Sequence, residues 1–93
     1  MEDRETRLKR LRIRSWRRGM KEMDLILGPF SDGPLRAQGD DLLNEYEALL
    51  DENDQDLYLW ITARTQNRAE GPEALARVMD EIAGFAASRL SGN

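Results

Sequence analysis

The apolar residues of this chain recur at helical spacing, and no other feature constrains the fold as strongly. The broadest stripe lies near the C-terminus, with an apolar residue every three or four positions. Residues at that spacing share one face of an α-helix, whereas no stretch alternates for long enough to predict a strand. We therefore predict an all-α fold with the last helix as the spine of its core. This stripe consists of Leu75, Val78, Met79, Ile82, Phe85 and Ala86.

The length limits the chain to one domain. Its 93 residues are too few for two independent hydrophobic cores. We predict a single helical domain over residues 1–93, built as a small compact bundle of about five helices. Residues 1–7 are expected to form a flexible arm and residues 91–93 a frayed tail.

The first half of the chain is predicted to hold two helices that meet at Gly19. One apolar stripe would suit a single long helix here, but a glycine weakens it and marks a junction. Gly28-Pro29 is expected to end the second helix, because glycine caps helices and proline does not continue them. Helices are thus expected at residues 5–16 and 18–27, before a loop at 31–39. The stripe runs through Ile13, Trp16, Met20, Met23 and Leu27, beside a second face of Leu8, Leu11 and Ser15.

Three more helices are predicted between polar connections. The third spans residues 40–51, the fourth follows a cap at Asn53 or Asp54, and the fifth begins with Pro72. Trp60 is expected on the buried face of the fourth helix, with a place at an interface as the alternative.

The charges are distributed unevenly along the chain. Residues 4–21 contain nine of the fourteen basic residues and one acid, whereas residues 22–93 carry a net charge of −10. Such an arm typically lies against its own acidic body or is solvated, and less often binds an anionic partner. We predict no nucleic-acid partner, because the body repels polyanions and no nucleic-acid motif is present. A basic-arm nucleic-acid-binding protein and a generic helical adaptor remain the alternatives.

The residue inventory argues against an enzyme. The chain has no histidine and no cysteine, which removes Ser-His and Cys-His pairs and thiolate metal sites. There is no phosphate-binding glycine loop, and the acids at 51–56 lack the spacing of a calcium loop. We predict no catalytic residue, no metal and no cofactor of its own, while the sequence leaves the binding of free FAD open.

The chain also lacks an apolar span long enough for a membrane, so we predict no membrane insertion and a cytoplasmic location. Glu2, Asp3 and Glu5 argue against a mitochondrial presequence, because such peptides are poor in acids.

The stretch from Trp16 to Phe30 carries the predicted partner-binding site. Arg18 and Glu22 are four residues apart, but such a pair contributes only about 0.3–0.5 kcal/mol. Gly19 between them costs about 0.5–1 kcal/mol relative to alanine. A glycine flanked by charges therefore suits a surface that another backbone approaches closely. We predict that four residues face inward, namely Met20, Met23, Leu27 and Phe30. The charged residues and the glycine are expected to stay outside as a docking face, which consists of Arg17, Arg18, Gly19, Glu22 and Asp24. The partner would contact Arg18, Gly19 and Glu22, with Trp16, Arg17, Met20 and Asp24 around them.

These residues resemble the hallmark of the succinate dehydrogenase assembly factors, or flavinators, including the bacterial FAD assembly factors. Their R-G-x-x-E motif is matched by Arg18, Gly19 and Glu22. The runs Pro29-Phe30 and Leu49–Trp60 extend the resemblance, which covers residues 8–85.

The resemblance implies a non-catalytic chaperone that is monomeric when free. It would bind the flavoprotein subunit of succinate dehydrogenase, or of the related fumarate reductase. There it would promote the covalent attachment of FAD to a histidine of the partner.

Overall fold

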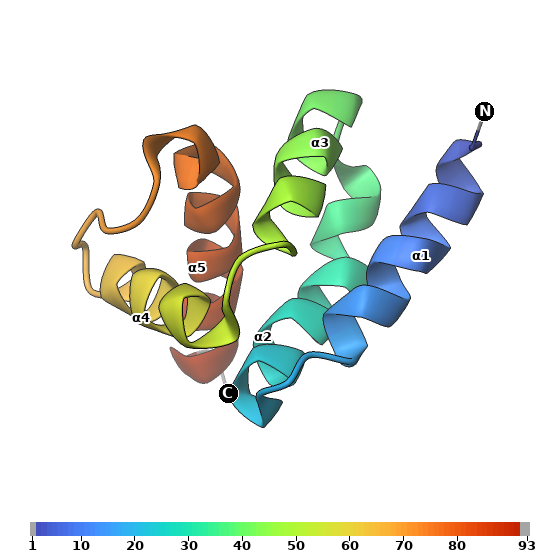
Figure 1. Ribbon diagram of the computed structural model, residues 1–93. Coiled ribbons are helices and arrows are strands. Elements are labelled where there is room, and N and C mark those ends of the chain that lie inside the picture. The colour runs from blue at the N-terminus through green and yellow to red at the C-terminus, as the bar shows by residue number, and fades with distance from the viewer. Residues whose placement is uncertain (1, 92–93) are drawn as a thin grey trace.

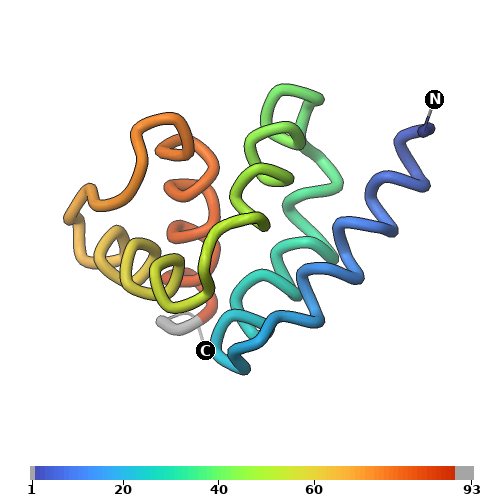
Figure 2. The backbone as a smooth tube through the Cα atoms, viewed as in Figure 1, coloured from blue at the N-terminus to red at the C-terminus, as the bar shows by residue number. Residues whose placement is uncertain are grey.

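The computed structural model describes residues 2–91, which form five α-helices and two short 3-10 helices around one core (Figure 1). No strand occurs in this part of the chain, so the predicted all-α class is confirmed. Figure 2 shows the chain reversing direction between α1 and α2, and α1 packs along α2 while α4 packs along α5. No helix within residues 2–91 is long and apolar enough to cross a membrane. The elements are α1 Arg4–Trp16, α2 Lys21–Asp32, η1 Pro34–Ala37, α3 Asp40–Leu49, α4 Asp54–Thr65, η2 Glu73–Leu75 and α5 Ala76–Ser91.

Helix α1 begins at Arg4, one residue before the predicted start, and ends at Trp16 as predicted. Asp3 caps it by accepting the backbone N–H of Thr6 at 2.8 Å. Arg4 lies in its first turn and donates to the backbone carbonyls of Arg36 and Gln38. The prediction of a flexible arm is therefore wrong for the residues from Arg4 onward. Residue 1 and the tail residues 92–93 lie outside the described residues, and Ser91 is the last residue of α5.

Helix α2 differs most from the prediction. It begins at Lys21 and continues through Pro29 to Asp32, instead of ending at Leu27. Gly28 does not act as a cap: the indole of Trp16 occupies the space that a side chain would fill. Phe30 is fully buried on the turn after Gly28. Burial of Phe30 thus outweighs the hydrogen bond that proline removes from the helix.

The junction predicted at Gly19 is confirmed, because α1 ends before it and α2 starts after it. The single long apolar stripe through both helices is not confirmed. Ile13 is 53% exposed, since the chain turns after Trp16 and carries α2 away from that face. The second predicted face of α1, with Leu8, Leu11 and Ser15, is the buried one.

The second half follows its local signals closely. α3 starts at Asp40 as expected, and the Asn53 side chain caps α4 by accepting two backbone N–H groups. Pro72 lies just before η2, so α5 itself begins later, at Ala76. Trp60 is half-buried and packs against the core, with its ring over Gly71, whose φ of +100° favours glycine.

A buried hydroxyl pair joins three helices at the centre of the core. The Ser15 and Tyr46 hydroxyls are 2.6 Å apart, and the Tyr46 hydroxyl donates to the Leu27 carbonyl. Burial raises the pKa of Tyr46 well above its ordinary value, so this group stays neutral. The ring of Tyr46 stacks on Phe30 with centroids 5.6 Å apart.

Candidate partner-binding site

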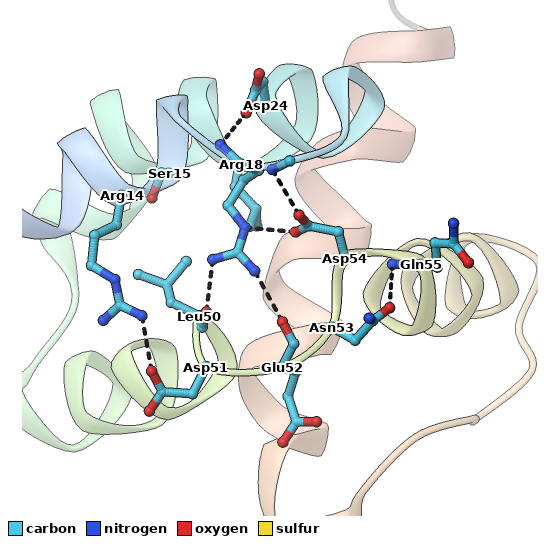
Figure 3. A network of polar contacts seen from close by, with 12 residues as sticks. Arg14, Ser15, Arg18, Asp24, Leu50, Asp51, Glu52, Asn53, Asp54 and Gln55 are labelled. Carbon is cyan, nitrogen blue, oxygen red and sulfur yellow. Dashed lines mark hydrogen bonds and ion pairs between the residues drawn. The ribbon is translucent and has the colours of Figure 1, made fainter.

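The corner between α1 and α2, residues 17–20, is clamped to the α3–α4 connection by Arg18. Its Nε donates to Asp54 Oδ1 at 2.6 Å. Its two terminal nitrogens donate to the carbonyls of Leu50 at 2.7 Å and Glu52 at 3.0 Å. Figure 3 shows the side chain pointing toward this loop, and it is only 10% exposed. The prediction that Arg18 faces outward beside Glu22 is therefore wrong.

Two carboxylates hold the backbone of the same corner. Asp24 Oδ1 accepts the N–H of Arg18 at 2.6 Å, and Asp54 Oδ2 accepts the N–H of Gly19 at 2.9 Å (Figure 3). Hydrogen bonds to ionised groups are stronger than those between neutral groups. Asp24, which we placed around the docking face, is thus half-buried and structural in this chain.

Gly19 is exposed, and nothing in the chain itself requires a glycine there. A Cβ added at this position would first meet Asp54 Oδ2 at 3.4 Å, close to ordinary van der Waals contact. Its φ also lies outside the left-handed region. The absence of a side chain therefore leaves open surface at the corner, where an incoming backbone can approach.

Three charged side chains surround Gly19 without internal partners. Arg17, Lys21 and Glu22 are exposed, and none of them has an ion pair within 4 Å among the described residues. Glu22 and Lys21 lie in the first turn of α2. Together with Gly19 they form a charged face, which we call the corner face.

Trp16 and Met20 border the corner face. Trp16 is 37% exposed, and its Nε1 donates to Asp32 Oδ1 at 3.2 Å. Met20 is half-buried against the core, whereas Met23, Leu27 and Phe30 are fully buried as predicted. The structure therefore gathers all seven predicted residues at one corner. They fall into an anchoring set, Arg18 and Asp24, a bordering set, Trp16 and Met20, and an outward set, Arg17, Gly19 and Glu22.

Sequence reasoning missed two residues of this site. Asp54 was expected only as a helix cap, yet it binds both Arg18 and Gly19. Lys21 was counted as part of the basic arm and not as part of the site. Asp54 gives no local signal of its role, because its partners lie 35 and 36 positions away.

The basic arm lies against the body. Six of its nine basic residues have a carboxylate within 4 Å. Glu47 accepts hydrogen bonds from both Arg7 and Arg10, and the one from Arg10 is the main cause that lowers the pKa of Glu47. Most of the arm's charge is thus neutralised internally, which confirms the first interpretation of the charge pattern. No cluster of acids suited to a metal ion occurs in residues 2–91.

The comparisons with known proteins identify the family. The sequence profile described as "flavinator of succinate dehydrogenase" matches residues 9–86, which include the whole corner face. This chain belongs to that flavinator family. The resemblance carried by the R-G-x-x-E motif is therefore confirmed.

The relatives of this flavinator-family chain include proteins named "succinate dehydrogenase assembly factor 2, mitochondrial". The one from Meyerozyma guilliermondii is 46% identical over 61 residues, which cover 66% of this chain and 45% of the relative. The one from Aspergillus terreus is 44% identical over 61 residues, covering 66% of this chain and 21% of the relative. The one from Yarrowia lipolytica is 37% identical over 83 residues, covering 87% and 57%.

The chain thus spans less than two thirds of the length of these relatives. They are fungal, not bacterial, and their names place them in the mitochondrion. These names contradict the cytoplasmic location that we predicted. No solved structure gives a significant match.

Proposed function

We propose that this chain is an assembly chaperone for succinate dehydrogenase: it binds the flavoprotein subunit and promotes the covalent attachment of FAD. The observation that carries the proposal is the family match over residues 9–86 together with the corner face inside it. In that face Arg17, Lys21 and Glu22 carry charges that have no ion pair among the described residues, next to a glycine that the fold does not require.

The proposed mechanism is positional. The chain has neither histidine nor cysteine, so it lacks the commonest general base and a thiolate nucleophile, and we propose that it is not an enzyme. FAD belongs to the partner, and we propose no cofactor for this chain. The chaperone would bind most tightly the conformation of the immature flavoprotein in which the partner's histidine lies against the flavin. Binding shifts the flavoprotein population toward that conformation.

Arg18 serves this mechanism indirectly. Its bonds to Asp54, Leu50 and Glu52 fix the corner before a partner arrives. A fixed corner loses less conformational entropy on binding than a mobile one. Rigid support for Arg17 and Glu22 is thus the role that we propose for the arginine of the motif.

The test is co-expression with the flavoprotein subunit of succinate dehydrogenase, followed by in-gel flavin fluorescence. We expect covalent flavin to rise with the wild type and to fall close to the level without chaperone for Glu22→Gln. Glu81→Gln is the matched control, because Glu81 is an exposed carboxylate on α5 beside the start of α3. Equal flavin signals with wild type, Glu22→Gln and no chaperone would overturn the proposal.

Fumarate reductase is the second partner that we propose, and the same assay with its flavoprotein tests it. The nucleic-acid alternative receives no support, since six of the nine basic residues of the arm are paired internally. A free chain that elutes as a monomer in size-exclusion chromatography would agree with our proposal of a monomeric state.

A further inference from the structure

An apolar groove lies between α2, α4 and α5, next to the corner face. It has a volume of about 330 Å³ and is lined mainly by carbon atoms. The two threonines in its wall donate their hydroxyl hydrogens to carbonyls of their own helix, so they offer the groove no free donor. Arg89 is the one charged residue among those that line it. The lining includes Leu25, Ile26, Ile61, Thr65, Phe85 and Arg89.

The groove continues the corner face along the outside of α2. Leu25 follows Lys21 by four residues and Glu22 by three, so the three side chains are neighbours on one helix face. Leu25 is 55% exposed, although it is a large apolar residue, and Ile26 beside it lines the groove. An exposed leucine that connects a charged face to an apolar groove suits an interface better than a solvated surface.

The arginines define the chemistry of the occupant. Three arginines, Arg17, Arg68 and Arg89, have no carboxylate of the described residues 2–91 within 4 Å. Arg17 lies in the corner face, and Arg89 lies at the groove, held with its Cζ 5.5 Å from the centre of the Phe85 ring. Because neither Arg17 nor Arg89 has a carboxylate partner within residues 2–91, both can pair with acidic groups of a binding partner.

We propose that this groove is a second anchor point for the flavoprotein subunit: it takes a bulky apolar side chain of the partner, with an adjacent carboxylate on Arg89. The inference rests on the proposed function and adds the place and chemistry of a second contact. The volume of about 330 Å³ is at the lower end for ligand sites, which suits one or two side chains better than a dinucleotide.

The experiment measures the affinity of the purified chain, residues 1–93, for the flavoprotein subunit by calorimetry, at low and at moderate salt. We expect Leu25→Asp to weaken binding by about tenfold or more, because it places a charge where an apolar contact forms. Arg89→Glu should weaken binding by a similar factor and reduce its dependence on salt, because an ion pair is lost.

Two matched controls separate this site from general surface effects. Leu59→Asp changes another exposed leucine, which is 60% exposed on α4 and is not among the residues that line the groove. Arg68→Glu reverses another arginine without a carboxylate partner. Both should bind within about twofold of the wild type. Melting curves show whether each variant is folded.

The outcomes distinguish the two proposals. If the wild type neither binds the flavoprotein nor raises its covalent flavin, both proposals are wrong. If the wild type binds and Leu25→Asp and Arg89→Glu bind equally well, the groove contacts no partner and only this inference is wrong. If the wild type is a dimer that Leu25→Asp converts to a monomer, the groove serves self-association, which also overturns the inference.

Discussion

Replacing Arg18 by methionine should unfold the corner and strongly destabilise the whole chain. Methionine retains most of the apolar stem but removes the guanidinium. The change would leave Asp54 without its ion pair and the carbonyls of Leu50 and Glu52 without their donors. The variant thus tests whether the arginine of the motif supports the fold or contacts the partner.

The magnitude follows from the burial of the pair. The side chains of Arg18 and Asp54 are 10% and 18% exposed, so little water is available to replace the lost partner. Removing one member of a buried pair costs about 3–5 kcal/mol. Partial hydration of the two carbonyls lowers this cost, and we expect a loss of about 3 kcal/mol. A domain of this size is stable by only about 5–15 kcal/mol, so the melting temperature should fall by roughly 10–25 °C.

The assay is urea unfolding followed by circular dichroism, with Arg17→Met as the control. Arg17 is exposed and has no ion pair among the described residues, so its replacement should change the free energy of unfolding by less than about 0.5 kcal/mol. A double-mutant cycle with Asp54→Asn should show coupling of about 1–3 kcal/mol. If Arg18→Met and Arg17→Met unfold at the same urea concentration, our account of the corner is wrong.

The same pair of variants separates stability from recognition. Arg17→Met should keep the fold and weaken binding of the flavoprotein. Arg18→Met should lose binding because the folded corner is lost, and lower temperature should restore part of it. A loss of binding by Arg18→Met without any loss of stability would show instead that Arg18 contacts the partner directly.

Two further predictions concern the packing of α1. Gly28→Ala should destabilise the chain by about 1–3 kcal/mol and shift the tryptophan fluorescence, because a methyl group there overlaps the Trp16 indole; Gly84→Ala, with open space around it, should be neutral or stabilising. Unchanged fluorescence in Gly28→Ala would contradict this packing. The hydrogen bond from Arg10 is the main cause that lowers the pKa of Glu47 below its ordinary value of 4.5. The ionised Glu47 therefore stabilises the fold above pH 4.5, and this contribution is lost as the pH falls through the folded-state pKa. The difference in unfolding free energy between wild type and Glu47→Gln should therefore shrink in acid, and a constant difference would refute the assignment.

The sequence by itself determined the fold class and the elements with local signals. The start of α3 at Asp40 and the cap at Asn53 were predicted correctly, because a helix dipole and a side-chain cap act within one turn. The core-facing stripe of α5 was predicted for a similar reason, because apolar residues at the 3.6-residue helical period are visible in the sequence alone. The motif around Gly19 also indicated the family by resemblance, and the family match confirms it.

Only the tertiary structure decided what the marked residues of the site do. Gly28 and Pro29 predict a helix end, yet the Trp16 indole fills the space beside Gly28 and α2 continues to Asp32. The sequence predicts Arg18 as a surface charge, yet its side chain is largely buried against partners that lie 32 to 36 positions away. In both cases the deciding contact joins residues that are distant in sequence, and its free energy exceeds the local preference that the pattern expresses. Packing therefore divides the motif into an arginine that holds the corner and neighbouring charges that remain free for a partner.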